Sequence, residues 1–430
     1  MTSNATLADA APAAPENWSP RALYTVACLG ITAGVQMSDM GLQALSLSSI
    51  QQSFGISDSW LGALQGLAGV LVGSAIAIPL ARFADRFSRK RVLLCLIAAS
   101  TAMMVLSALA PSFPLFFLGR SAAGITEFAM IPLVYSMIPD LAPERHRVAT
   151  NLSFAALMAL GASGGFYFGG AIIATADGLF GLPIEPWRKG FLLLSFAGLP
   201  LLLLAAFTLD PARRIVSSDP KTTGALTLFL RQRWQAVGLF VGVAGALMVA
   251  VQALNQLITL ALEREFHAEV ARIGQAMGMI VLVTTIGCLP IAWFLDRLLS
   301  RRFGRAARPL IMGLSAVAAI PFAFLLLAAP TLEQALMAVA AFMFMTCTAN
   351  ALVPTMLQDL TPATLRARSF AIWSFVVSIF SATGPLLAGT LSDRVTGNHL
   401  LNAITLTAIP ALAISATCAV RSFLRARAEG

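Results

Sequence analysis

Long apolar runs separated by short polar stretches fill nearly all of the chain after Arg21. A helix needs about 20 mostly apolar residues to cross the hydrocarbon core of a bilayer. We therefore expect an all-α polytopic membrane protein. The runs predict twelve membrane-spanning helices, near residues 22–47, 59–81, 92–110, 115–138, 149–175, 190–209, 236–260, 274–295, 309–328, 334–357, 369–391 and 400–420.

The longest polar connection divides six predicted spans from six. It contains the sequence LTLFLRQRW, which predicts an amphipathic helix lying on the membrane surface. Very short connections elsewhere force neighbouring spans to run antiparallel. The expected units are a tail at 1–21, a six-helix bundle at 22–209, a linker at 210–235, a second six-helix bundle at 236–420 and a tail at 421–430.

Composition and charge agree with a membrane protein. Only 11% of the residues are charged, against about 25% in soluble domains. The net charge is +9, and most of the 29 lysines and arginines fall in alternate connections between the spans. That asymmetry follows the positive-inside rule and places both termini in the cytoplasm. We expect a monomer in a bacterial cytoplasmic (inner) membrane, with the lipid bilayer as its surroundings and no nucleic-acid partner.

One charged loop occurs twice. Residues 81–91 read ARFADRFSRKR, and the stretch that begins at Ala292 reads AWFLDRLLSRR. Each copy lies between two apolar runs. Membrane proteins whose halves repeat in this way are usually transporters built from two related bundles. The sequence therefore predicts a transporter with internal twofold symmetry.

A second pair of matched loops supports the duplication. Asp140-Leu-Ala-Pro143 follows the fourth span, and Asp359-Leu-Thr-Pro362 follows the tenth. Both acids are followed by an arginine at the same offset.

The repeated loop has two interpretations. It is either an ordinary basic loop that fixes orientation, or a cytoplasmic gate. In a gate, the aspartate caps the N-terminus of a neighbouring helix or pairs with an arginine in one transport state. The same position of the acid in both copies favours the gate. Its candidate residues are Asp85, Arg86, Arg89, Asp296 and Arg297.

Three charged residues lie well inside predicted spans: Asp39, Arg120 and Glu127. Each buried charge costs at least about 2.5–3.5 kcal/mol on insertion scales, so each requires a reason. Depth counted along the helices brings Asp39 of the first span level with Arg120 of the fourth. Glu127 shares the helix face of Arg120 but lies closer to the midplane. Two interpretations remain open: a structural ion pair, or a site for a coupling proton and an anionic substrate group.

The second half of the chain offers polar groups within its spans but no buried charge. Three amides on the seventh span share one helix face, and further groups lie on the tenth and eleventh spans. They either line a substrate pocket or make hydrogen bonds between helices. These candidates are Gln252, Asn255, Gln256, Asn350, Trp373 and Ser374.

The loop at 81–91 resembles the signature of the major facilitator superfamily, Gly-x-x-x-Asp-Arg-x-Gly-Arg-Lys, with Ala81 and Ser88 in place of the two glycines. That resemblance extends over essentially the whole chain and implies the major facilitator fold. Within the superfamily the chain is similar to the Spinster-like branch. The residues that carry this similarity are Asp39, Gly-Leu-Ala at 66–68, Gly119-Arg120, Gly124-Ile-Thr-Glu127, Gly384-Pro385, Gly389 and Ser392-Asp393.

The branch implies that Asp39, Arg120 and Glu127 form the functional site. It also implies amphipathic lipid substrates such as lysophospholipids, although small organic acids fit a bacterial relative equally well. Met40 and Phe128 depart from the branch beside two of these residues, where arginine and a small residue are usual.

The fifth span contains glycines at 161, 164, 165, 169 and 170. Their spacing resembles the antiporter signature Gly-x-x-x-Gly-Pro-x-x-Gly-Gly of the superfamily, with Phe166 in place of proline. The alternative is close helix packing, which small residues four apart permit.

Other classes of function are disfavoured. A membrane enzyme needs a buried histidine or a metal set, whereas His146, His267 and His399 fall in loops. The five cysteines lie in apolar runs without paired spacing, and no channel-filter motif occurs. No nucleotide-binding loop is present, so we expect a proton gradient as the energy source and no cofactor. The partners are then a small-molecule solute and protons, with uniport or a non-transporting sensor as alternatives.

Overall fold

The computed structural model describes residues 17–73, 75–76, 87–210, 222–362 and 365–428. In these ranges the regular structure is entirely helical. The helices of the first half are α1 (Pro20–Leu45), α2 (Leu47–Phe54), α3 (Asp58–Ala63), η1 (Leu64–Val72), α5 (Arg89–Ala108), α6 (Phe113–Leu141), η2 (Glu144–His146), α7 (Arg147–Leu179), α8 (Pro186–Phe196) and α9 (Gly198–Ala206). Those of the second half are α10 (Thr222–Gln232), α11 (Trp234–Phe266), α12 (Val270–Phe303), η3 (Gly304–Ala306), α13 (Ala307–Ala328), α14 (Leu332–Asn350), α15 (Val353–Leu360), α16 (Arg366–Arg394) and α17 (Leu400–Ala428).

Nine stretches of the described chain are helical, long and apolar enough to cross a membrane. One of them, Val270–Ala328, holds two spans, α12 and α13. The remaining two spans are α1, whose second half is less apolar because it carries Gln36, Asp39 and Gln43, and α3 continued by η1. The predicted fold of twelve membrane-spanning helices in two bundles is therefore confirmed.

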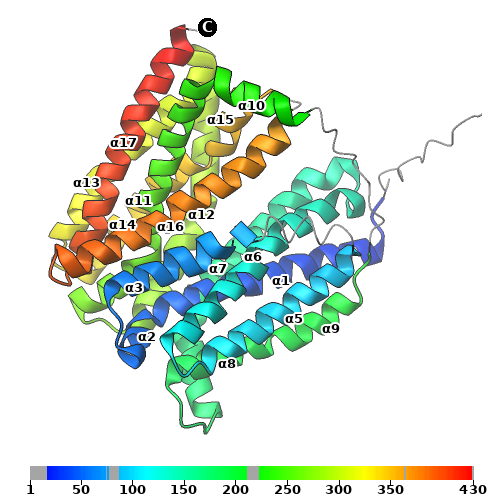
Figure 1. Cartoon of the computed structure of the whole chain (residues 1–430), viewed down its shortest axis with the longest axis vertical. Helices are drawn as coiled ribbons and strands as arrows, with labels where there is room; N and C mark the ends of the chain where they lie inside the picture. The colour runs from blue at the N-terminus through cyan, green and yellow to red at the C-terminus, as the bar shows by residue number, and fades with distance from the viewer. Residues whose placement is uncertain (1–16, 74, 77–86, 211–221, 363–364, 429–430) are drawn as a thin grey trace, which may run out of the picture.

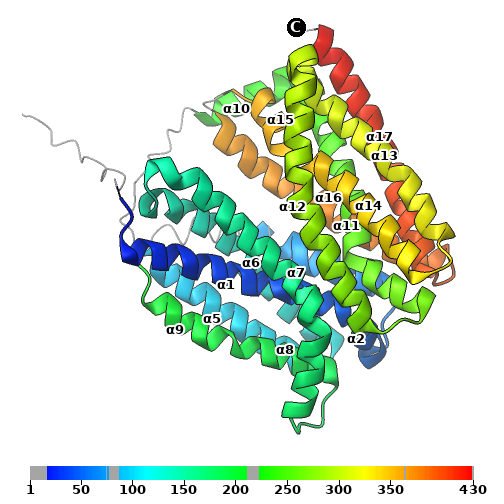
Figure 2. The same ribbon diagram turned by 180° about the vertical axis from the view of Figure 1, so that it is seen from behind.

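Helices α1 to α9 form one bundle and α11 to α17 form the other (Figures 1 and 2). The bundles contact each other where α3 and η1 meet α16, and where α7 meets α12. Figures 1 and 2 show the bundles meeting at one end of the molecule and diverging toward the other. We call the first the closed end; it contains the α2–α3, α11–α12 and α16–α17 connections.

Glycines allow this close contact between the bundles. A Cβ at Gly62 of α3 would lie 2.2 Å from the carbonyl oxygen of Pro385, and a Cβ at Gly389 of α16 would lie 2.2 Å from that of Asp58. Both obstacles are backbone atoms, which cannot swing away as a side chain does. The glycines of the eleventh span that resemble the Spinster-like branch therefore let two helix backbones touch.

The glycines of α7 serve the same purpose on two faces. Gly161 packs against the backbone of Gly34 on α1, and Gly170 packs against Ala271 on α12. Ser163 of α7 also donates a hydrogen bond of 2.8 Å to the carbonyl oxygen of Gly278 on α12. Helix packing accounts for the spacing of these small residues.

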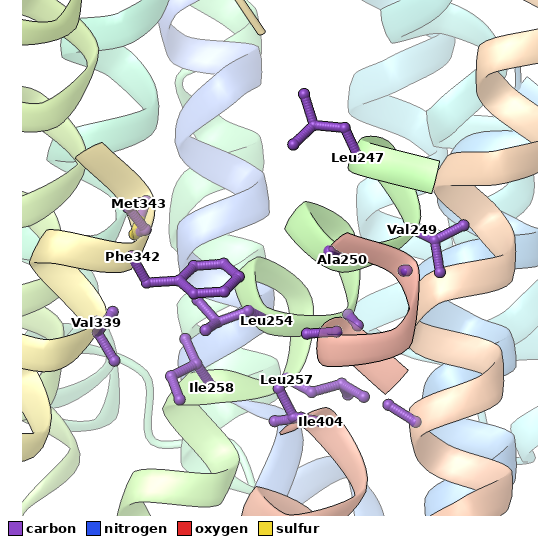
Figure 3. Close-up of a cluster of buried hydrophobic side chains, with 14 of the residues drawn as sticks. Leu247, Val249, Ala250, Leu254, Leu257, Ile258, Val339, Phe342, Met343 and Ile404 are labelled. Carbon is purple, nitrogen blue, oxygen red and sulfur yellow. The ribbon is translucent and has the colours of Figure 1, made fainter. Parts of the chain in front are cut away.

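The interior of the C-terminal bundle is built around α11. Figure 3 shows Leu254 and Ile258 of α11 beside Val339 and Phe342 of α14, with Ile404 of α17 close by. Lipid tails are as apolar as these side chains, so the bundle is held by van der Waals contact and interhelical hydrogen bonds rather than by exclusion of water.

The close backbone contact predicts a strong effect of a single methyl group. Gly62→Ala should cost about 1–3 kcal/mol in the conformer with the closed end together, the usual cost of overpacking. Spin labels at Gln52 and His399, both exposed at this end, should report a larger population with the bundles apart. The distance distribution between the two labels would be measured by pulsed electron–electron double resonance in a cysteine-free background.

Gly178→Ala is the matched control, because open space surrounds Gly178 on α7. Its distance distribution should equal that of the parent. An unchanged distance distribution in Gly62→Ala would show that the two helix backbones accommodate the added methyl group without a cost in free energy.

Candidate functional site

A buried ion pair joins α1 to α6. Nη1 of Arg120 donates to Oδ2 of Asp39 at 2.6 Å. The two side chains are only 6% and 1% exposed. The structure therefore brings together two of the three charged residues that the sequence singles out, at the depth expected from counting along the helices.

The pair is incompletely satisfied. Oδ1 of Asp39 and Nε of Arg120 are buried and have no hydrogen-bond partner in the described part of the chain. The guanidinium carbon of Arg120 lies 5.5 Å from the ring centroid of Phe191 on α8, a cation–π distance. A buried polar atom without a partner is costly. Among the described residues, the site therefore leaves one acceptor on Asp39 and one donor on Arg120 for a proton or a polar ligand group.

Glu127 lies on α6, two helical turns from Arg120. Its side chain is outside the described part of the structure. The predicted role of Glu127 therefore remains a prediction.

A chain of amides extends from the ion-pair helix to the other bundle. Gln43 of α1 donates to Gln65 of η1, and Nε2 of Gln65 donates to the backbone carbonyl of Gln256 on α11 at 3.1 Å. Gln43 and Gln65 are 4% and 5% exposed. Neither residue is among the candidates predicted from the sequence. Both could have been identified from the sequence, because each is a large polar residue within an apolar run.

Gln65 also stands at the start of a π-helical segment, Leu64–Val72. Segments of this kind occur frequently at functional sites, because the wider turn re-aims side chains. The middle residue of the amide chain, Gln65, therefore lies on the π-helical span.

The other predicted pocket residues occupy different environments. Gln252, Asn255 and Gln256 are half-buried on α11, whereas Asn350 is exposed at the last residue of α14. The described contacts bring none of these four side chains onto the ion pair.

Trp373 is only 9% exposed, and its ring packs 4.7 Å from that of Phe240 inside the C-terminal bundle. Together with Phe229 and Leu230 of α10, it lines an apolar cavity of about 50 Å³. Ser374 is exposed and donates to the carbonyl oxygen of Phe370 on its own helix, at 2.9 Å.

The two duplicated loops place equivalent ion pairs at the end opposite the closed end. Arg89 of α5 pairs with Asp140 of α6, and Arg308 of α13 pairs with Asp359 of α15. The partners are 51 residues apart in both cases. The second pair of matched loops in the sequence thus corresponds to a repeated ion pair in the structure.

The remaining gate candidates of the second copy lie near that contact. Asp296 accepts hydrogen bonds from Nε of Arg308 at 3.2 Å and from Oγ of Ser300 at 3.1 Å. Arg297 is exposed and lies over the ring of Trp293 at 5.3 Å. Asp85 and Arg86 fall outside the described residues. Within the described ranges, every ion pair at this end stays inside one bundle.

At the closed end, by contrast, an ion pair crosses between the bundles. Arg264 of α11 donates to both carboxylate oxygens of Asp58 on α3, at 2.8 and 2.7 Å. Ser392 of α16 donates to the same carboxylate at 2.6 Å. Asp58 is 2% exposed.

Asp393 completes the contact by capping α3. It accepts from the backbone N–H of Asp58 at 3.1 Å and from that of Ser59 at 2.8 Å. An acid in the last turn of its own helix opposes the helix dipole, but the same acid stabilises the N-terminus of another helix. We call Asp58, Arg264, Ser392 and Asp393 the inter-bundle latch. Of these four residues, only Ser392 and Asp393 stand out in the sequence, through the resemblance to the Spinster-like branch.

A second charged cluster at this end lies within the N-terminal bundle. Arg188 of α8 donates to the carbonyl oxygens of Ala108 and Ala110 at 3.0 and 2.7 Å, which satisfies the C-terminus of α5. It also pairs with Glu185 at 2.6 Å. Burial raises the pKa of the Glu185 carboxyl, but its own backbone N–H and Arg188 together lower the pKa by more. The net pKa is therefore below the ordinary value.

Two six-helix bundles that meet at one end, with charged residues buried on the central helices, define the architecture of a membrane transporter. The chain belongs to the Major Facilitator Superfamily, whose family model matches residues 29–327.

Two curated relatives are chloramphenicol efflux pumps of Mycobacterium tuberculosis, 26% identical over 145 residues. The match covers 33% of this chain and 35% of each pump, so the chain spans about a third of the length of these relatives.

Solved structures match over nearly the full length. A bacterial homologue of the human lysosomal transporter Spinster, inward-facing and unoccupied, is 19% identical, with a TM-score of 0.80 over 96% of this chain and 98% of that one. A D-xylose–proton symporter is 16% identical, with a TM-score of 0.68 over 91% of this chain and 97% of that one. The predicted likeness to the Spinster-like branch is thus confirmed at the level of the fold.

The latch predicts that Asp58→Asn favours the conformer with the closed end apart. Asp58 is buried and Arg264 is partly exposed, so the loss should be roughly 2 kcal/mol, between the values for exposed and buried pairs. A cysteine at Ser392 should then react faster with a membrane-impermeant maleimide, by about 30-fold, since 1.4 kcal/mol is a factor of ten.

The control is Glu333→Gln, which removes an exposed ion pair with Arg272 inside one bundle at the same end. Equal labelling rates in the two variants would show that the latch does not hold the bundles together.

Proposed function

We propose that this chain is a proton-coupled secondary transporter that moves a small organic or amphipathic anion by alternating access. The observation that carries the proposal is the buried Asp39–Arg120 pair with one unsatisfied atom on each partner. A pair that served only to lock two helices would be more stable with every polar atom satisfied.

The orientation rests on the distribution of charge. Basic residues gather at the end opposite the latch, where α5 begins and where α12 and α17 end. By the positive-inside rule this end faces the cytoplasm, together with both termini. The structure is then an inward-facing conformer of a protein in a bacterial cytoplasmic membrane. Its similarity to an inward-facing Spinster homologue supports this assignment of state.

Proton coupling follows from the chemistry of the pair. A proton on the free Oδ1 of Asp39 neutralises the carboxylate and weakens its hold on Arg120. The guanidinium then turns to the nearest remaining anion, either Glu127 or an acidic group of the substrate. A single arginine shared between two acids and a substrate links protonation to binding, because only one partner is fully bound at a time.

The substrate class is proposed from the same groups. Arg120 selects an anionic or strongly polar headgroup, and the surrounding apolar helices accept a hydrophobic tail. The amides Gln43 and Gln65, together with Gln252, Asn255 and Gln256, supply neutral hydrogen-bond partners for the rest of the molecule. Lysolipids and other amphipathic metabolites have this combination. The pumps and symporters to which the chain is similar carry different cargoes, so their names do not select one.

The duplicated loop is proposed as the cytoplasmic gate of the opposite conformer. In the present conformer Arg89 and Asp296 have partners within their own bundles. Closing the cytoplasmic end would bring the two loops together and allow Asp85, Arg86 and Arg297 to exchange partners across the bundles. The latch at the other end would open in the same movement.

Uniport is the second candidate. One observation favours it: the Asp39–Arg120 pair is already formed and nearly inaccessible to solvent. If both acids only hold helices together, the same pocket would move its substrate without protons.

Removal of the acids distinguishes the two candidates. A thermal-shift panel of lysophospholipids, organic acids and chloramphenicol would select the probe, and uptake would be measured in proteoliposomes. Asp39→Asn and Glu127→Gln should each reduce uptake driven by a pH gradient about 100-fold, at the low end of the range for loss of a positioned proton-transfer group. Counterflow without a gradient should persist.

Asp177→Asn is the control, since Asp177 is a half-exposed acid that pairs with Lys189 away from the site. Gradient-driven uptake that survives both site substitutions would leave uniport as the function.

The pair also predicts a non-additive effect on stability. Arg120→Gln leaves the carboxylate of Asp39 buried without a cation, which should cost about 3–5 kcal/mol. Adding Asp39→Asn removes the unpaired charge and should recover most of the lost free energy of unfolding. The measurement is thermal unfolding in detergent. Transport should remain absent in the double variant. Additive losses would mean that the two residues do not interact.

A further inference from the structure

A basic cavity opens on the outer surface of the N-terminal bundle, far from the contact between the bundles. It lies where the first turns of α1 and α5 meet the end of α9, and its volume is about 580 Å³. Figures 1 and 2 both show these three helix ends side by side. The cavity is lined by Arg21, Tyr24, Lys90, Ala206, Phe207, Thr208 and Leu209.

Hydrogen bonds from the segment after α9 give the cavity a fixed shape. Tyr24 donates to the carbonyl oxygen of Leu204 at 2.7 Å, which fixes its ring, and Leu209 donates its backbone N–H to Thr25 at 2.9 Å. The backbone N–H of Lys90 donates to Asp210 at 3.3 Å. The carboxylate of Asp210 is thereby held at the N-terminus of α5.

Two cations at this cavity have no acidic partner. The guanidinium of Arg21 and the ammonium of Lys90 form no ion pair with any residue in the described part of the chain. Asp210 is the acid at the rim, and Arg91 adds a further exposed positive charge beside Lys90. The local balance is therefore positive, which suits a ligand with a phosphate group.

An apolar stripe leads away from the cavity along α9. Leu199, Leu203 and Phe207 are spaced four residues apart and are 59%, 63% and 69% exposed. At 1.5 Å per residue, the stripe runs about 12 Å along the helix. It starts at the cavity wall, because Phe207 belongs to both. This geometry matches a molecule with an anionic head and an apolar chain.

We propose that this cavity binds an anionic phospholipid of the cytoplasmic leaflet. Its phosphate lies between Arg21 and Lys90, and one acyl chain follows Leu199, Leu203 and Phe207. The charge distribution assigns this end to the cytoplasm, where anionic lipids attract basic residues at the membrane surface. Because all three helices belong to one bundle, the site stays intact when the bundles move, and the proposal does not depend on the transported substrate.

Native mass spectrometry of the full chain in detergent tests the proposal by titration with phosphatidylglycerol and, separately, phosphatidylcholine. The parent protein should bind the first phosphatidylglycerol more tightly than phosphatidylcholine. The double variant Arg21→Gln/Lys90→Gln should bind phosphatidylglycerol about 30-fold more weakly, the loss expected for two cations near an anionic surface. Each single variant should lose about fivefold, which provides a readout if the double variant folds poorly.

The matched control is Arg301→Gln/Arg305→Gln, which removes two exposed charges at the same end of the other bundle. It should leave the affinity for the first phosphatidylglycerol within twofold of the parent. An equal loss in this control, or equal affinity of the parent for both lipids, would overturn the proposal. Displacement of phosphatidylglycerol by millimolar inorganic phosphate would also overturn it, because the site would then recognise a soluble anion.

Discussion

The cost of an unpaired charge in hydrocarbon is the constraint on which this structure depends. Each charge that lies inside the described spans must pair with a residue on another helix, or have a function that offsets its cost. Asp39 and Arg120 meet across α1 and α6, and among the described residues one atom on each side has no hydrogen-bond partner. The same pair therefore joins α1 to α6 and leaves polar atoms for a proton or a ligand. Both properties support the proposed coupling role, since a coupling pair must be strong enough to persist and incomplete enough to exchange partners.

The same constraint explains why the two ends of the molecule differ. At the end opposite the latch, Arg89 and Arg308 are paired within their own bundles, so the ion pairs of the described residues there do not join the bundles. At the closed end, the described partners of the Asp58 carboxylate are Arg264 and Ser392 of the other bundle and Gln51 beside it. Glycines then let the backbones approach closely enough for these hydrogen bonds to form. In the proposed alternating-access cycle, one set of contacts is exchanged for the other and each bundle moves as a unit.

The part of the candidate site that could be predicted from the sequence is the part whose residues are improbable in an apolar run. Asp39 and Arg120 stood out because a charge in a span needs a reason, and their equal depth followed from helical rise alone. Gln43 and Gln65 are equally buried but carry no charge. A neutral amide in an apolar run is less unusual than a charged group, so the sequence did not single them out. Trp373 was expected on the wall of a substrate pocket; it packs against Phe240 and lines a small apolar cavity inside the C-terminal bundle. The sequence indicates which residues share one face of a helix, but the packing of the neighbouring helices decides which residues that face contacts.

The sequence by itself determined the class of fold, the twelve spans, the internal duplication and the charged pair, because these depend on periodicity, length and the energetic cost of charge in lipid. The tertiary structure alone decided which ends of the bundles touch. Asp58 and Arg264 are ordinary charges at the ends of spans until folding brings them to 2.7 Å. The basic cavity formed by α1, α5 and α9 likewise joins residues from three distant segments. Contacts of this kind depend on how whole helices pack, and no local pattern in the chain encodes that.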